Sequence, residues 1–200
     1  MVRTVLSLPS LESRPKADWE ACGWWGREPL WRRVRERAVA EPANAAVIDE
    51  TGSLTYGELW EAALDGARAL RGAGLNPGEI VLTQLPNWRE YVTVLLACEV
   101  SGAVFSFCPI KWGPRECARA LDLLRPRLWV TSAEFLGEGR MEIIDDAVRA
   151  TAEPVEPVLV RGGAKGYRTW SEVVDAAPSM TEEEATANAE KSTESACAQP

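Results

Sequence analysis

Residues 80–107 read I-V-L-T-Q-L-P-N-W-R-E-Y-V-T-V-L-L-A-C-E-V-S-G-A-V-F-S-F and form one complete unit of the predicted fold. The run 80–85 is mainly apolar, which is typical of a strand buried on both faces of a parallel sheet. After a Pro-Asn break, residues 88–100 carry apolar side chains at helical spacing. Gly102 ends this helix, and 103–107 again has the composition of a strand. The stretch therefore predicts a strand–helix–strand unit, from which parallel sheets are built.

The same alternation continues on both sides of this unit. Thr55 and Glu58 have the T-x-x-E spacing of a capping box, which predicts a helix start at this point. Ser132 is expected to cap a short helical turn. Further strands are expected at 46–48, 53–55, 128–131 and 155–160, and further helices at 29–40, 55–72, 114–124, 141–150 and 170–176. The sequence therefore predicts an α/β fold, with alternating strands and helices and a parallel-type sheet covered by helices.

Composition excludes several classes of function. The 200 residues contain no His, so they cannot supply a Ser-His-Asp triad, a histidine general base or an imidazole metal ligand. Lys and Arg number 22 against 30 Asp and Glu, a net charge of −8 that argues against nucleic-acid binding. No stretch reaches the roughly 18 apolar residues of a membrane span. The 5 cysteines form no C-x-x-C pair, which favours reduced, mostly buried thiols in a cytoplasmic protein.

One glycine-rich stretch could hold phosphate. Residues 161–166 read R-G-G-A-K-G after a predicted strand, where backbone N–H groups and Lys165 could contact an anion. A P-loop needs G-x-x-x-x-G-K-[ST] leading into a helix, and here a glycine follows the lysine. A flexible turn is therefore the favoured interpretation, with a phosphate cradle as the alternative. Charged side chains elsewhere are interpreted as solvated helix faces: Arg32, Arg33, Arg35, Arg37, Asp145 and Asp146. We assign no catalytic, cofactor-binding or metal-ligating residue.

Several short segments, taken in order, carry a family resemblance. They are L-T-Y-G-E-L at 54–59, G-L-N-P-G-E-I-V at 74–81, Q-L-P-N-W-R-E at 84–90, L-A through G-A-V at 96–104, and P-I followed by R-E at 109–116. Together they resemble the AMP-dependent synthetase and ligase family, the adenylate-forming enzymes that include acyl-CoA synthetases. With a tryptophan after Asn87, the segment at 84–90 resembles that of the family members that act on cyclic or aryl carboxylates.

The resemblance implies a reaction, and it also shows which segments of the family are not found in residues 1–200. Family members activate a carboxylate with ATP and Mg²⁺ to an acyl-adenylate and then usually form a thioester with coenzyme A. Their phosphate loop, a Ser/Thr/Gly-rich segment ending in P-K-G, should follow residue 177. The sequence continues instead with P-S-M-T-E-E-E, and the adenine pocket, hinge and C-terminal catalytic domain would lie later still. No family catalytic residue transfers to a position here, and no cofactor is expected for these residues by themselves.

These observations predict three regions and one main function. Residues 1–17 are expected to be a loose leader, 18–177 the first subdomain of the family's large N-terminal domain, and 178–200 a disordered acidic tail. The tail has 5 Glu, one Lys and no aromatic residue, Leu, Ile or Val. We expect an N-terminal fragment of an acyl-CoA synthetase that is inactive by itself. One alternative is a non-catalytic module that self-associates or docks on a partner, and another is an unrelated nucleotide-binding domain that uses the loop at 162–166.

Overall fold

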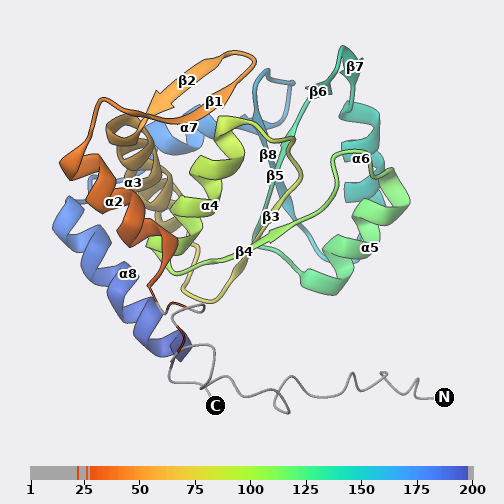
Figure 1. Cartoon of the computed structure of the whole chain (residues 1–200). Helices are drawn as coiled ribbons and strands as arrows, with labels where there is room; N and C mark the ends of the chain where they lie inside the picture. The colour runs from red at the N-terminus through yellow and green to blue at the C-terminus, as the bar shows by residue number, and fades with distance from the viewer. Residues whose placement is uncertain (1–21, 23–25, 27, 198–200) are drawn as a thin grey trace.

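A five-stranded parallel sheet runs through the middle of the protein. The structure is a computed structural model that describes residues 22, 26 and 28–197, with side chains through residue 190. The sheet has the order β4-β3-β5-β8-β9 (Figure 1). Its strands are β3 (Ile80–Thr83), β4 (Val104–Phe107), β5 (Leu128–Ser132), β8 (Glu156–Val160) and β9 (Arg168–Thr169). All four pairings are parallel, so the predicted sheet type is confirmed.

Helices cover both faces of this sheet, because its central strands alternate two apolar sets. Val81, Val130 and Val158 face a core that includes side chains of α3 and α4. Their neighbours along the strands, among them Leu82 and Trp129, face a second core with α5 and α6. The helices are α2 (Leu30–Ala40), α3 (Tyr56–Gly72), α4 (Arg89–Ser101), α5 (Pro114–Leu124), α6 (Met141–Ala150), α7 (Trp170–Asp175) and α8 (Glu182–Cys197). Two short antiparallel hairpins complete the fold: β1 (Ala45–Asp49) with β2 (Gly52–Thr55), and β6 (Glu134–Phe135) with β7 (Glu138–Gly139).

The start of α3 confirms the predicted capping box. The Glu58 amide donates to Thr55 Oγ1 at 3.3 Å, and the Thr55 amide donates to Glu58 Oε2 at 2.8 Å. Further along, Gly66 lets α3 approach α4 closely, because a Cβ at this position would lie 2.7 Å from the Ala97 Cβ. α3 and α4 therefore pack closely together on one face of the sheet, and the β1–β2 hairpin contributes Val47 and Leu54 to a core shared with both helices.

The expected disordered tail is instead helix α8 over most of its length. Ala185 and Ala189 are 2% and 0% exposed, in a core shared with α2, α3 and α4. Glu182 accepts from the Arg35 Nε at 2.9 Å and from the Trp60 indole at 3.1 Å. The expectation of disorder rested on the lack of large apolar residues. Alanines one turn apart can bury a helix against close neighbours, and here the acidic residues pair with arginines of α2.

Other predictions differ in detail or stay untested. Ser132 caps no helical turn, because it ends β5 and its hydroxyl donates to the Glu134 carbonyl at 2.6 Å, next to the β6–β7 hairpin. The leader expected at 1–17 lies outside the described residues, as does most of the stretch 18–27. The boundary between leader and domain therefore remains a prediction. No helix in the described part of the chain has the length and apolar character needed to cross a bilayer.

Candidate functional site

The carboxyl ends of β3, β5 and β8 share one edge of the sheet. The crossover after β3 leads through α4 to β4 on one side, and the crossover after β4 leads through α5 to β5 on the other side. The chain therefore reverses its direction across the sheet between β3 and β5. Open α/β sheets bind ligands outside the carboxyl ends of strands at such a reversal. This edge is where a functional site is expected.

Arg161 joins three segments at this edge. It follows β8 with a φ of 48°, and each nitrogen of its guanidinium donates to a carboxylate. Nε and Nη2 bind both oxygens of Glu90 at 2.8 and 2.9 Å, Nη1 binds Glu50 at 2.7 Å, and Nη2 also binds Asp49. The guanidinium carbon lies 4.1 Å from the ring centre of Trp88. Arg161 thus fastens the β1–β2 hairpin and the start of α4 to the end of β8.

Asp49 is the most buried carboxylate of this cluster, with a side chain 1% exposed. Desolvation would raise its pKa, but hydrogen bonds from the Thr51 hydroxyl, the Arg89 and Thr51 amides and Arg161 outweigh it and hold the pKa well below its usual range. For Arg161, desolvation would lower the pKa, but the bonds to Glu90 and Asp49 raise it overall. Both shifts favour the charged forms of Asp49 and Arg161, which are held in a network of hydrogen bonds and ion pairs.

A second polar group lies buried near the ends of β3 and β4. Gln84 is 0% exposed, and its Nε2 donates to the Pro109 carbonyl at 3.0 Å and to Cys117 Sγ at 3.2 Å. Arg140 is 5% exposed and donates through Nη1 to the Ile110 carbonyl. Burial raises the pKa of the Cys117 thiol and of the nearby Cys108 thiol. The pKa of Cys108 rises to about 12, with a further contribution from Cys117. Neutral thiols are poor nucleophiles, so the group braces the loop after β4 instead of offering reactive chemistry.

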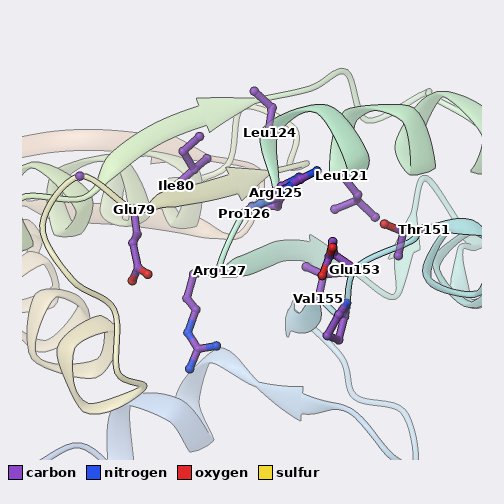
Figure 2. A pocket seen from close by; sticks show the side chains of 12 residues that line it. Glu79, Ile80, Leu121, Leu124, Arg125, Pro126, Arg127, Thr151, Glu153 and Val155 are labelled. Carbon is purple, nitrogen blue, oxygen red and sulfur yellow. The ribbon is translucent and has the colours of Figure 1, made fainter.

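Two hollows lie at opposite edges of the sheet. One of about 510 Å³ opens beside Arg161 and is lined by Trp88, Phe135 and Met141, with the tip of the β6–β7 hairpin over it. The other, of about 470 Å³, lies at the amino ends of β3 and β8. Figure 2 shows the second hollow, with Glu79 and Arg127 on one side and Leu121 on the other. Ligands of open α/β sheets bind at the carboxyl edge, so the hollow beside Arg161 is the better candidate.

The glycine-rich loop does not form a phosphate cradle in this structure. Lys165 is exposed, no helix begins directly after it, and the chain turns back through a hydrogen bond from the Tyr167 amide to the Ala164 carbonyl at 3.1 Å. Gly162 and Gly166 have φ values of 83° and 93°, which fits the favoured interpretation as a turn.

The other charged groups that the sequence singled out have structural partners. The arginines of α2 pair with glutamates: Arg32 with Glu190, Arg33 with Glu28, Arg35 with Glu182 and Arg37 with Glu41. Asp145 accepts from the Tyr167 hydroxyl and Asp146 pairs with Arg149. No group of three possible metal ligands occurs within the described ranges. The role of Arg161 was not predicted from the sequence, although its partners Trp88 and Glu90 lie in the family-like segment at 84–90.

Comparison with known proteins identifies the class of this α/β fold. The AMP-binding enzyme family profile matches residues 34–200, so the chain belongs to this family of AMP-forming acyl- and aryl-CoA ligases. The match runs through α8, which places that helix inside the family domain.

Individual relatives agree with this assignment. A salicylyl-CoA synthase / salicylate adenylyltransferase of Streptomyces sp. is 33% identical over 147 residues, covering 72% of this chain and 26% of the relative. A 2-hydroxy-7-methoxy-5-methyl-1-naphthoate–CoA ligase of Streptomyces carzinostaticus is 34% identical over 119 residues, covering 56% of this chain and 21% of the relative. The apo structure of MbtA from Mycobacterium smegmatis superposes with a TM-score of 0.70 at 26% identity, covering 84% of this chain and 32% of that structure. The chain thus spans a third or less of the length of each.

Proposed function

We propose that residues 1–200 are the opening α/β segment of an adenylate-forming ligase for an aryl carboxylate, and that by themselves they activate no substrate. The observation that carries the proposal is the state of the carboxyl edge. Arg161, the cation that lines the hollow at this edge, is already occupied by Asp49, Glu50 and Glu90. Adenylation needs preorganised cations and N–H donors around the phosphates. A triphosphate at this edge would meet three carboxylates and no free guanidinium nitrogen of Arg161.

The aryl class of substrate has two supports. The curated relatives described above are named for salicylate and for a substituted naphthoate. Trp88, in the segment that resembles aryl-acid ligases, lines the hollow beside Arg161, with Phe135 edge-on at 6.4 Å. In the proposed parent reaction, the carboxylate attacks the α-phosphorus of ATP and pyrophosphate leaves. The thiol of coenzyme A then attacks the acyl carbon of the acyl-adenylate, loses its proton to solvent and displaces AMP. We place this reaction in the cytoplasm, since the buried Cys98, Cys108 and Cys117 are all free thiols.

Calorimetric titration of the chain with MgATP tests the proposal against the nucleotide-binding alternative. We expect no saturable heat from the wild type, and the same from Lys165→Ala. Saturable binding that Lys165→Ala abolishes would contradict the proposal and support the phosphate cradle at 162–166. Saturable binding unaffected by this substitution would contradict both, because it would require another set of donors.

The docking alternative is favoured by exposed apolar side chains near β4 and α5. Phe107 is 66% exposed, Val104 47% and Leu123 78%. Such a patch marks an interaction site when nothing covers it. Sedimentation velocity at increasing protein concentration separates the two readings. We expect one monomeric species at all concentrations, whereas a concentration-dependent species of defined stoichiometry would favour the docking module.

A further inference from the structure

The outer edge of β4 is open in the described part of the chain, where β3 is its one partner. The Val104 amide donates to the Glu79 carbonyl at 2.9 Å, and the Cys108 amide donates to the Thr83 carbonyl at 3.0 Å. Alternate residues of a strand point their N–H groups to opposite sides. The amides of Phe105 and Phe107 therefore point away from β3, toward the open edge.

This edge lacks two of the usual protections against pairing with another strand, which are charged side chains and proline. β4 reads V-F-S-F, without charge or proline. Beside it, a hollow of about 350 Å³ between β4 and α5 has mainly apolar walls, which include Phe107, Trp112 and Leu123. Proteins normally blunt, charge or cover such an edge, because it would otherwise pair with another chain. An extended segment with apolar side chains on one face fits both the open amides and the hollow.

The sequence offers such a segment outside the described residues. Residues 4–8 read T-V-L-S-L, bounded by Arg3 and Pro9. In an extended conformation Leu6 and Leu8 share one face with Thr4, while the other face carries Val5 and Ser7. The segment is as long as an ordinary short strand, and proline is tolerated at a strand end.

The geometry brings this segment within reach of β4. The Trp31 amide donates to the Glu99 carboxylate at 2.9 Å, which holds the start of α2 against the last turns of α4. The residue after α4 is Gly102, which leads into β4, so the start of α2 lies near the start of β4 (Figure 1). Residues 10–28 can span about 60 Å when extended. A domain of this size has a radius of gyration of about 16 Å, so the linker is long enough.

We propose that residues 4–8 add as a strand to the open edge of β4, with Leu6 and Leu8 in the hollow between β4 and α5. The segment accepts hydrogen bonds from the Phe105 and Phe107 amides and removes the exposed apolar surface around Phe107. Its attachment keeps the chain monomeric by occupying the edge that a second copy would use.

Amide hydrogen exchange on the full-length chain, resolved by NMR, tests the proposal. In the wild type we expect the Phe105 and Phe107 amides to be protected. The double variant Leu6→Asp/Leu8→Asp should speed their exchange by about tenfold or more, while the amide of Val130 in β5 stays unchanged and reports an intact fold. Val5→Asp/Ser7→Asp is the matched control, since it adds the same two charges on the other face and should leave both amides protected.

Three results would overturn the proposal. The first is unprotected Phe105 and Phe107 amides in the wild type. The second is protection that the double variant does not reduce. The third is protection that appears only as the protein concentration rises, together with a dimer in sedimentation, because the occupant would then be a second copy. None of these outcomes depends on ATP binding, so the proposal can fail independently of the proposed function.

Discussion

Replacing Arg161 by methionine should loosen the β1–β2 hairpin and lower stability by an amount that the structure allows us to estimate. The substitution removes the contacts to Asp49, Glu50 and Glu90 and the stacking on Trp88. Methionine keeps the unbranched aliphatic stem. Arginine and methionine also pay a similar steric cost for the left-handed backbone conformation at this position, where φ is 48°. The difference therefore reports the guanidinium and its contacts.

The expected loss in free energy of unfolding is about 2–3 kcal/mol. Removing one partner of a buried ion pair costs about 3–5 kcal/mol, and a cation–π contact adds roughly 1. The Arg161 side chain is 20% exposed, and Asp49 keeps Arg89 at 3.6 Å and the Thr51 amide at 2.9 Å, so the value falls below that range. For a chain of this size the loss corresponds to a fall in Tm of roughly 5–10 °C.

Urea denaturation with Arg168→Met as the matched control measures this loss. Arg168 also pairs with a glutamate, at 2.6 Å to Glu156, but the two side chains are 45% and 43% exposed. An exposed pair is worth about 0.5 kcal/mol, so the control should change little. If both variants lost the same small amount with unchanged m-values, the idea that Arg161 fastens three segments would be refuted.

Three further predictions follow from the same structure. The folded-state pKa of Asp49 lies below its ordinary 3.8, so its contribution is present above that value and is lost as the pH falls below it; Asp49→Asn should therefore flatten the acid limb of a stability–pH curve. Ala189→Gln in α8 should cost about 1–3 kcal/mol in thermal unfolding, whereas Ala187→Gln, which is exposed, should stay within about 0.5; equal effects would contradict the packing of α8. Gly66→Ala should destabilise by about 1–3 kcal/mol although alanine favours helices, because its Cβ meets Ala97 at 2.7 Å, and an increase in Tm would show that the helices separate at little cost.

Helices and strands were predicted well, because capping residues, glycine stops and apolar spacing all depend on residues that are close together in the sequence. The capping box at Thr55 and the strand–helix–strand unit at 80–107 both appear in the structure close to their expected bounds. The family was also predictable, since five short segments in a fixed order rarely occur together by chance. The carboxyl edge of the sheet could be anticipated from the α/β class.

Long-range contacts could not be predicted in the same way. Arg161 and Asp49 stand 112 residues apart, and nothing near Arg161 in the sequence names its partners. Glu182 meets Trp60 across 122 residues, so the burial of α8 depends on packing that composition does not reveal. Disorder was predicted at 178–200 because this stretch has few large apolar residues. That criterion ignores the close helix contacts that alanines allow.

Pyrophosphate release tests the central claim most directly. The purified chain is mixed with ATP, Mg²⁺ and a panel of carboxylates that includes benzoate and salicylate, with an intact ligase of the same family as the positive control. The account predicts release no faster than in the blank without protein, because Arg161 is already paired and residues 1–200 contain no T-S-G…P-K-G loop. Release that depends on the chain, on ATP and on the carboxylate would contradict it.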